Sequence, residues 1–236
     1  RSEDQWKQYP YGFPGRWLEL LRYVRAKLPN TRLMYDINFT DDSVNSGNLA
    51  SSGGEFERWR YRIVDLADRS NPEERQIWQD LTTFWSELDA VGFDIYRSLA
   101  SPNQQLPTDF NDLVNVLKQR SDSYATQMDT GLTQIEMTLN FHQNAIIKEI
   151  GFRSVDRGFI DPFAYSGTGT VNIPHQAAAY QAVFASFWEP KWPWFKGINY
   201  WDIAVDPSRL GPNDNSFSPV GKPQTEQVIQ NHFFHN

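Results

Sequence analysis

The sequence predicts an α/β protein with a parallel sheet, and three observations lead to that prediction. A helical pattern comes first, and strand and helix patterns then alternate four times, which is the order that parallel strands joined by crossover helices produce. The strand patterns begin at residues 33, 91, 145 and 197, so each repeat exceeds the roughly 31 residues of an average barrel unit and carries large loops. The 236 residues are 39% hydrophobic and 15% aromatic, which supports a packed core and excludes a disordered chain.

The first part of the chain contains one strand between helices. Apolar residues recur at helical spacing from Trp17 to Leu28. A short apolar strand follows over 33–38, and a stretch rich in Ser, Asn and Gly over 41–54 predicts a loop. Residues 55–69 predict a helix. Another helix begins after Asn71, because Asn is a favoured N-cap and Pro and Glu follow it in the first turn.

The remaining strands alternate with helices and one long loop. A strand over 91–96 precedes a helix that begins at Asp109, and helical character resumes over 131–142. A strand over 145–151 leads into a Gly-punctuated segment at 153–174, which is typical of a functional loop. The last expected elements are a helix over 176–188, a strand over 197–202 and a short helix over 225–233.

Composition and charge exclude several classes of function. The net charge is −7 and the basic residues are scattered, whereas a nucleic-acid-binding surface needs a basic stripe. No apolar run approaches the roughly 18 residues of a membrane span. The absence of Cys excludes disulfides, a thiol nucleophile and Cys-ligated metals, and it suits a secreted or cell-envelope protein. The four His residues show no ligand spacing, so we expect no metal site and no cofactor.

Strand alternation indicates one functional face. Side chains alternate across a strand, and one parity brings Asn38, Tyr96, Glu149 and Trp201 to the carboxyl ends of the four strands. Ligands bind at those ends in parallel α/β folds. A strand-end Asn, Tyr or Trp is also compatible with a loop anchor or a core position. Glu149 points more clearly to function, since a Glu between Ile147 and Ile150 is costly to bury without a partner.

The aromatic segment 188–194 and the histidines near the C-terminus leave structural alternatives open. Residues 188–194 contain three Trp and two Pro, so the segment is either a sugar-binding platform or a rigid loop packed on the barrel rim. His232 and His235 lie near the end of the chain, where we expect them to be solvated.

Five segments together resemble glycoside hydrolase family 113, a clan A family of β-mannanase-like (β/α)8 TIM barrels. The segments KEIGFRS at 148–154, GINYWD at 197–202 and SPVGKP at 218–223 are similar to the family's TEIGY-S, G-x-x-x-W-D/A-W and SP-GKPA motifs of strands seven and eight and the run that follows. The segments GFDIY at 92–96 and LMYDIN at 33–38 are similar to its strands six and five. The match runs in order from about Trp17 to Ile229.

This resemblance implies a retaining glycoside hydrolase that acts on a β-linked polysaccharide such as β-1,4-mannan. Such enzymes use two carboxyl groups, one as nucleophile and one as acid/base. Carried over by motif, Glu149 is the nucleophile and Tyr96 orients it, while Trp201 stacks under the sugar and Asn38 lines the same subsite. Arg153 is a further substrate-binding candidate at a less constant position.

The resemblance also implies that residues 1–236 form one domain that is only the C-terminal half of the barrel, about strands 5–8. The chain begins at Arg1, apparently past the family's strand four, whose end carries the acid/base Glu. We therefore expect the polysaccharide as substrate and the missing N-terminal half, from the same protein or a partner subunit, as partner. The alternatives are a non-catalytic glycan-binding barrel and a structural domain of a larger surface or assembly protein.

Overall fold

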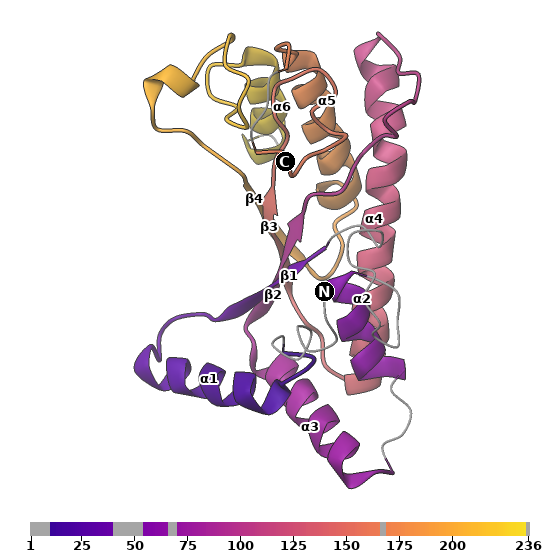
Figure 1. Ribbon diagram of the computed structural model, residues 1–236, viewed down its shortest axis with the longest axis vertical. Helices are drawn as coiled ribbons and strands as arrows, with labels where there is room; N and C mark the ends of the chain where they lie inside the picture. Colours follow the sequence, from indigo (N-terminus) through magenta and orange to yellow (C-terminus); the bar gives the residue numbers. More distant parts are fainter. Residues whose placement is uncertain (1–9, 40–53, 66–69, 166–168, 235–236) are drawn as a thin grey trace. The chain divides into compact units, whose positions relative to one another are not determined.

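The computed structural model describes residues 10–39, 54–65, 70–165 and 169–234. The chain divides into two compact units, which we describe separately: the first contains Arg1–Asp94 and Met128–Ile146, and the second contains Ile95–Gln127 and Ile147–Asn236. Strands and helices alternate as predicted (Figure 1).

The elements in chain order are α1 (Pro14–Lys27), β1 (Met34–Asn38), α2 (Glu55–Arg60), a π-helical turn (Tyr61–Asp65), α3 (Pro72–Glu87), β2 (Ala90–Ile95), α4 (Phe110–Leu139), β3 (Ala145–Ile150), α5 (Ile173–Val183), a second π-helical turn (Phe184–Trp188), β4 (Phe195–Tyr200), a 3-10 turn (Pro207–Arg209) and α6 (Pro223–Phe234).

The strands form one sheet in the order β1-β2-β3-β4, which agrees with the predicted α/β class. β1 and β2 are parallel, with Met34 opposite Ala90 and Asn38 opposite Asp94. The predicted alternation is visible in β1, where Ile37 is buried while its neighbours Asp36 and Asn38 are exposed. β1 and β4 stand at the two ends of this strand order.

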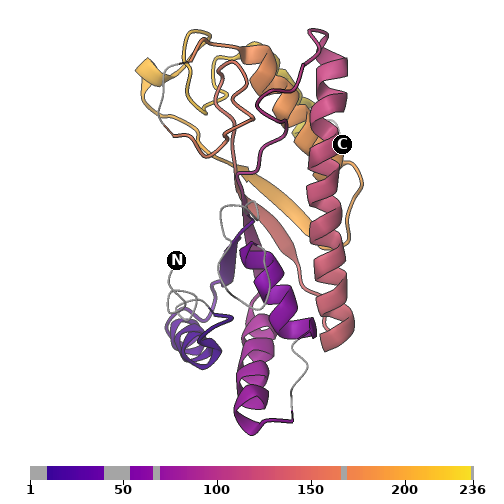
Figure 2. The same ribbon diagram turned by 45° about the vertical axis from the view of Figure 1, so that its right-hand side comes forward.

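In the first unit, an aromatic core joins the strands to the helices. The rings of Trp59 and Phe84 stack with their centroids 6.0 Å apart, and Phe56 meets Phe93 edge to face at 5.0 Å. α1 and α3 contact each other at an angle (Figure 1). α2 lies against β1 (Figure 2). Trp59 belongs to the helix predicted over 55–69, which is α-helical to Arg60 and continues as a π-helical turn.

One helix agrees with its sequence pattern and another differs from it. α3 begins as predicted, since the Asn71 side chain accepts the backbone N–H of Glu73 at 2.9 Å. The helix that begins after Asp109 continues without a break to Leu139, rather than resuming at residue 131. The polar composition of residues 118–130 hides its buried stripe, in which Leu117, Tyr124 and Met128 face the protein interior.

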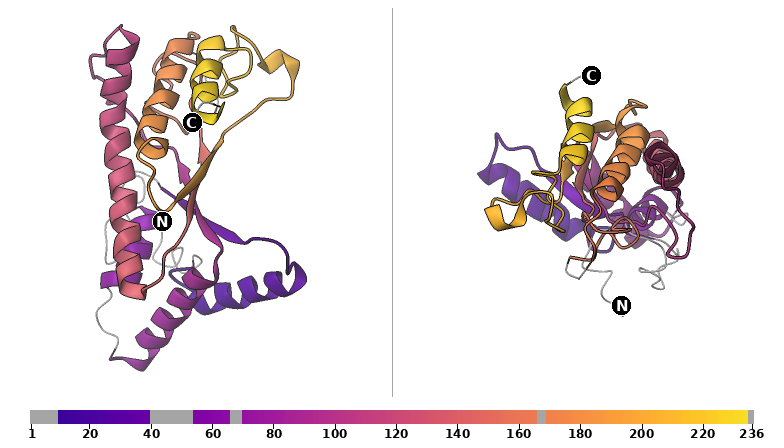
Figure 3. Two further views of the ribbon diagram at one scale, coloured as in Figure 1. Left: turned by 180° about the vertical axis from the view of Figure 1, so that it is seen from behind. Right: turned by 90° about the horizontal axis from the view of Figure 1, so that it is seen from above.

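The second unit places α5 and α6 next to each other (Figure 3). The expectation that His232 is solvated is wrong: it is buried in α6, its ring stacks on Phe184 with centroids 4.2 Å apart, and its Nδ1 lies 2.8 Å from the Val228 carbonyl. Amphipathic helix packing, rather than distance from the chain end, decides its environment. His235 lies outside the described residues.

The segment 188–194 is a packed loop in this structure. Trp194 is buried, and the indole Nε1 of Trp192 donates to the Ser186 carbonyl at 2.9 Å. The segment precedes β4, so it lies at the amino end of that strand, whereas ligands of parallel α/β folds bind at carboxyl ends. This position favours the structural alternative. Within the described residues, no helix is long and apolar enough to cross a membrane.

Candidate functional site

A tyrosine–carboxylate pair lies at the ends of the two central strands. Glu149 is the penultimate residue of β3, and Tyr96 directly follows β2. The Tyr96 hydroxyl donates a hydrogen bond to Glu149 Oε2 at 3.1 Å, and both side chains are half-buried. The structure therefore brings together two residues that are 53 positions apart in the sequence. A donor to a carboxylate stabilises its ionised form, which is the form that a nucleophile requires.

The backbone at Trp201 lies directly against the residue after this strand. The Trp201 N–H donates to the Ile150 carbonyl at 2.8 Å. A Cβ atom on Gly151 would lie 1.9 Å from the Trp201 carbonyl oxygen, so only glycine allows this approach. The peptide bond between Trp201 and Asp202 is cis. The Trp201 side chain remains 36% exposed, which leaves its indole available to a ligand.

Arg153 has backbone partners in the structure. It is buried, and its Nε donates to the carbonyl of Asn215 at 3.2 Å. This contact links the loop after β3 to the loop after β4, which is a structural task. Its role in substrate binding stays a prediction.

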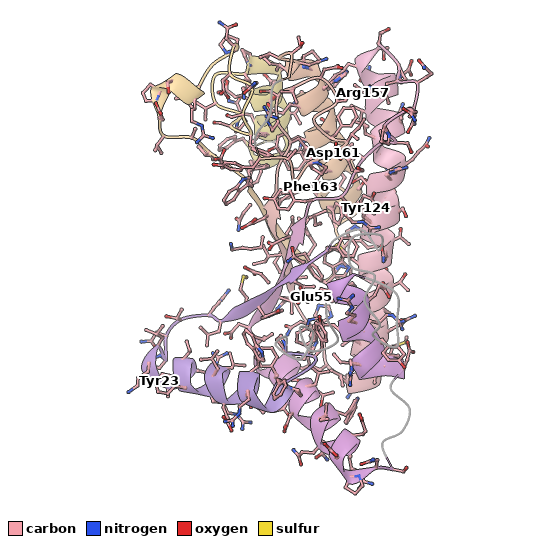
Figure 4. The ribbon with its side chains drawn as sticks, viewed as in Figure 1. Tyr23, Glu55, Tyr124, Arg157, Asp161 and Phe163 are labelled. Atoms are coloured by element: carbon pink, nitrogen blue, oxygen red, sulfur yellow. The ribbon has the colours of Figure 1, made fainter. Side chains whose placement is uncertain are left out.

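Asn38 belongs to the first unit, where a buried glutamate holds its backbone. Glu55, the first residue of α2, is 5% exposed, and Figure 4 labels it beside β1. Its carboxylate accepts the Tyr35 hydroxyl at 2.8 Å and the Asn38 N–H at 3.1 Å. Burial raises the pKa of Glu55 above its ordinary value, although these hydrogen bonds oppose the shift. Sequence reasoning missed Glu55, because an acidic residue in the first turn of a helix is typical of an exposed position.

The SPVGKP segment contains a fully buried lysine. The Lys222 ammonium donates to Asp214 Oδ2 at 2.9 Å and to the carbonyls of Ser216 and Ser218 at 3.2 and 2.5 Å. Burial lowers the pKa of Lys222, while the hydrogen bond to Asp214 opposes this. Burial acts to raise the pKa of Asp214, but hydrogen bonds from Ser216 and Lys222 outweigh it and lower that pKa. This ion pair closes the loop that follows β4.

Gln176 ties this loop to the segment after β3. Its Nε2 donates to the carbonyls of Phe152 and Phe217 at 2.8 and 3.0 Å, and its Oε1 accepts the Thr225 hydroxyl at 3.1 Å. Both polar atoms of the side chain are thereby satisfied inside the protein by three hydrogen bonds, as buried amides require. In the sequence, Gln176 is an ordinary polar residue of a helix, and nothing local signals its position.

The described residues contain no group of three or more His, Cys, Asp or Glu side chains that could hold a metal ion. The strand ends carry a carboxylate with a phenolic hydrogen-bond donor, and an exposed indole follows β4.

No curated protein matches the sequence. A GH113 β-mannanase from Alicyclobacillus acidocaldarius, solved in complex with ManMIm, is 19% identical and aligns with a TM-score of 0.53 over 91% of this chain and 48% of that chain. Two structures of GH113 β-1,4-mannanase are each 14% identical, with TM-scores of 0.40 and 0.42, over 91% of this chain and 77% of theirs.

This chain thus spans about half the length of the Alicyclobacillus structure, and the likeness in TM-score shows a shared fold. The model of Glycoside Hydrolase Family 113 matches residues 69–222. That range includes both members of the Tyr96–Glu149 pair, Trp201 and Lys222. Because the match extends over well more than half of the sequence, the chain belongs to glycoside hydrolase family 113.

Proposed function

We propose that this chain supplies the nucleophile half of a retaining glycoside hydrolase that cleaves β-1,4-mannan. The observation that carries the proposal is the hydrogen bond from Tyr96 to Glu149 at the carboxyl ends of β2 and β3. Family membership and the similar fold of the Alicyclobacillus β-mannanase support the class of substrate.

In this mechanism, one Glu149 oxygen attacks the anomeric carbon. A bond forms between carbon and Oε as the glycosidic bond breaks, and an acid protonates the leaving oxygen. Water then hydrolyses the glycosyl–enzyme ester, and the deprotonated acid takes a proton from that water. Tyr96 orients the Glu149 carboxylate through its hydrogen bond, and Trp201 offers a flat apolar surface to the sugar. Asn38 and Arg153 are assigned to substrate binding by the family motif alone.

The acid/base belongs, in this proposal, to a segment that completes the barrel. β1 and β4 stand at the ends of the strand order, and the chain spans 48% of the Alicyclobacillus β-mannanase. An edge strand of a parallel sheet exposes unpaired N–H and C=O groups, which favour pairing with another strand. The missing half, from the same protein or a partner subunit, is therefore the proposed partner of this chain.

The nucleophile can be tested in this chain alone by choosing a substrate that needs no acid. A 2-deoxy-2-fluoro-mannosyl donor with a dinitrophenolate leaving group departs without protonation, and its fluorine slows hydrolysis of the ester. We expect a single mass addition on the peptide that contains Glu149, and none in Glu149→Gln. The matched control is Glu136→Gln, since Glu136 is an exposed glutamate on α4 paired with His142; this variant should be labelled normally.

Reducing-end release from β-1,4-mannan by the polypeptide with both barrel halves gives the second readout. Glu149→Gln should abolish release and preserve binding, because the amide keeps the shape and loses the nucleophile. Equal release by wild type and Glu149→Gln would eliminate Glu149 as nucleophile. Binding without release or labelling in either protein would instead support the non-catalytic glycan-binding alternative.

A further inference from the structure

A cavity lies within the second unit, and the Tyr96–Glu149 pair is not part of its lining. Its volume is about 440 Å³, within the roughly 300–1,000 Å³ typical of small-molecule sites. The loop after β2, the start of α4 and the start of α5 border it. Its lining includes Leu106, Pro107, Thr108, Phe110, Arg157 and His175. Neither Tyr96, Glu149 nor Trp201 lines it.

The walls of this cavity are held in place by hydrogen bonds between two loops. The two terminal nitrogens of Arg157 donate to the carbonyls of Pro102 and Gln104, each at 2.5 Å. The Leu99 N–H donates to the Phe159 carbonyl at 2.9 Å. Figure 4 shows Arg157 beside the amino-terminal end of α4. A cavity with fixed walls loses little conformational entropy when a ligand enters, which favours binding.

His175 supplies a hydrogen-bond donor to this cavity. Its Nδ1 accepts the Arg157 backbone N–H at 3.0 Å, so the proton of the neutral ring resides on Nε2. Burial lowers the pKa of His175, and the nearby Asp156 carboxylate, 3.2 Å from Nδ1, opposes that shift. Among the described residues none accepts a hydrogen bond from Nε2, which leaves this N–H for a ligand.

The charges around the cavity disfavour an anion. Among the described residues that line it, Arg157 alone is charged, and both of its terminal nitrogens already donate to carbonyls. The first turn of α5 is capped, because Asn172 Oδ1 accepts the His175 N–H at 3.1 Å, and Pro174 has no N–H. An anion would therefore find few uncommitted donors at this helix end.

The remaining surface suits a neutral molecule with one apolar face and several hydroxyl groups. Leu106, Pro107 and Phe110 offer apolar surface, while Thr108 and His175 offer a hydroxyl and an N–H. A pyranose presents the same combination, since its C–H groups form apolar patches and its hydroxyls surround the ring. Aromatic and apolar walls with a few placed polar groups are typical of such binding sites.

We propose that this cavity is a second carbohydrate site, which binds a short neutral segment of a β-linked glycan away from Glu149. The identity of the glycan rests on the proposed function, whereas the preference for a neutral sugar rests on the cavity itself. In a polysaccharide-degrading protein, such a site would hold the chain near the strand-end carboxylate and raise the local substrate concentration.

The test follows two sets of NMR signals while β-1,4-mannotriose is added to this chain. The methyl groups of Leu106 and Leu113 report on the cavity, and the indole N–H of Trp201 reports on the strand-end site. We expect saturable shifts at both leucines. Thr108→Val, which removes an exposed hydroxyl at similar volume, should weaken binding at the leucines about fivefold, the typical effect of one hydrogen bond, and leave the Trp201 curve unchanged.

Phe110→Leu provides an independent variant, because it removes the flat ring and keeps an apolar residue; it should also weaken the leucine response. Tyr23→Leu is the matched control, since Tyr23 is an exposed aromatic on α1 in the first unit, and it should change neither curve. Addition of sodium phosphate should leave the leucine signals in place, and a saturable phosphate shift would overturn the assignment to a neutral ligand.

The outcomes separate this inference from the proposed function. Leucine shifts that depend on Thr108, together with no labelling of Glu149, would support the second site and refute the hydrolase proposal. Labelling of Glu149 without leucine shifts would refute the second site alone. The same conclusion would follow if the leucine binding curves were unchanged in both Thr108→Val and Phe110→Leu.

Discussion

Gly151→Ala offers a sharp test of how β3 and the end of β4 fit together. In the structure, a Cβ atom at Gly151 would lie 1.9 Å from the Trp201 carbonyl oxygen, 2.9 Å from its carbonyl carbon and 3.1 Å from Phe217 Cδ1. Real Cβ contacts essentially never fall below 3.0 Å, so the two backbones must separate by about 1.1 Å, which is 3.0 minus 1.9. The adjacent hydrogen bond from Trp201 to Ile150, now 2.8 Å, would lengthen beyond useful range.

Overpacking of this kind costs roughly 1–3 kcal/mol in protein cores. We expect the upper end, about 3 kcal/mol, because the clashing atoms are backbone and cannot rotate away. For a chain of this length, such a loss lowers the melting temperature by about 6–12 °C. Urea unfolding followed by tryptophan fluorescence measures it directly, since Trp201 is a reporter at the site of the change.

Gly15→Ala is the control substitution. Its new Cβ would meet Asp80 Oδ2 at 2.9 Å, but that atom ends a flexible side chain that can move, and alanine gains about 0.5–1 kcal/mol of helix propensity over glycine. We therefore expect no destabilisation. If Gly151→Ala unfolded at the same urea concentration as wild type, the tight contact between Gly151 and Trp201 would be refuted.

Three further substitutions test individual interactions. Lys222→Met should cost about 3–5 kcal/mol in urea unfolding, because it leaves the Asp214 carboxylate without its buried partner; a loss below about 1 kcal/mol would show that the pair is unimportant. Tyr96→Phe should slow labelling of Glu149 by about 10–100-fold, as expected for a lost hydrogen bond to a charged group; an unchanged labelling rate would contradict the orienting role. Glu55→Gln should stabilise the protein at neutral pH and not in acid, because the folded-state pKa of Glu55 is raised. With glutamate at this position, the native state loses stability as pH rises from the ordinary Glu pKa through the raised one. Equal effects of the substitution on urea unfolding at both pH values would contradict this prediction.

Local signals and strand alternation account for what the sequence could predict. The N-cap at Asn71 depends on neighbouring residues alone, and it was correct. The pairing of Tyr96 with Glu149 follows from alternation in two strands that end at the same edge of the sheet. Strand ends were less accurate, since β4 covers Phe195–Tyr200 and leaves Trp201 beyond the strand.

The interactions that could not be predicted join segments far apart in the chain. The buried position of His232 depends on Phe184, which comes from a different helical segment. The close approach at Gly151 depends on a residue fifty positions later, and Glu55 is buried only because Tyr35 and Asn38 meet it. Local sequence patterns carry no information about partners that lie far away in the chain. The role of such a residue can therefore be assigned only after its three-dimensional contacts are known.

Distant contacts of this kind also hold the SPVGKP segment in place. Ser154 donates its backbone N–H to the Ser216 carbonyl at 3.1 Å and its hydroxyl to the Asp214 carbonyl at 2.7 Å. Lys222 fixes the same carbonyl-rich turn from the other side. The segment therefore braces the chain just after Glu149, and Gly151 lets the end of β4 approach it. The proposed nucleophile must be held to within a fraction of an ångström of its productive position, and in the proposed mechanism the buried Lys222–Asp214 pair and its loop contribute that support.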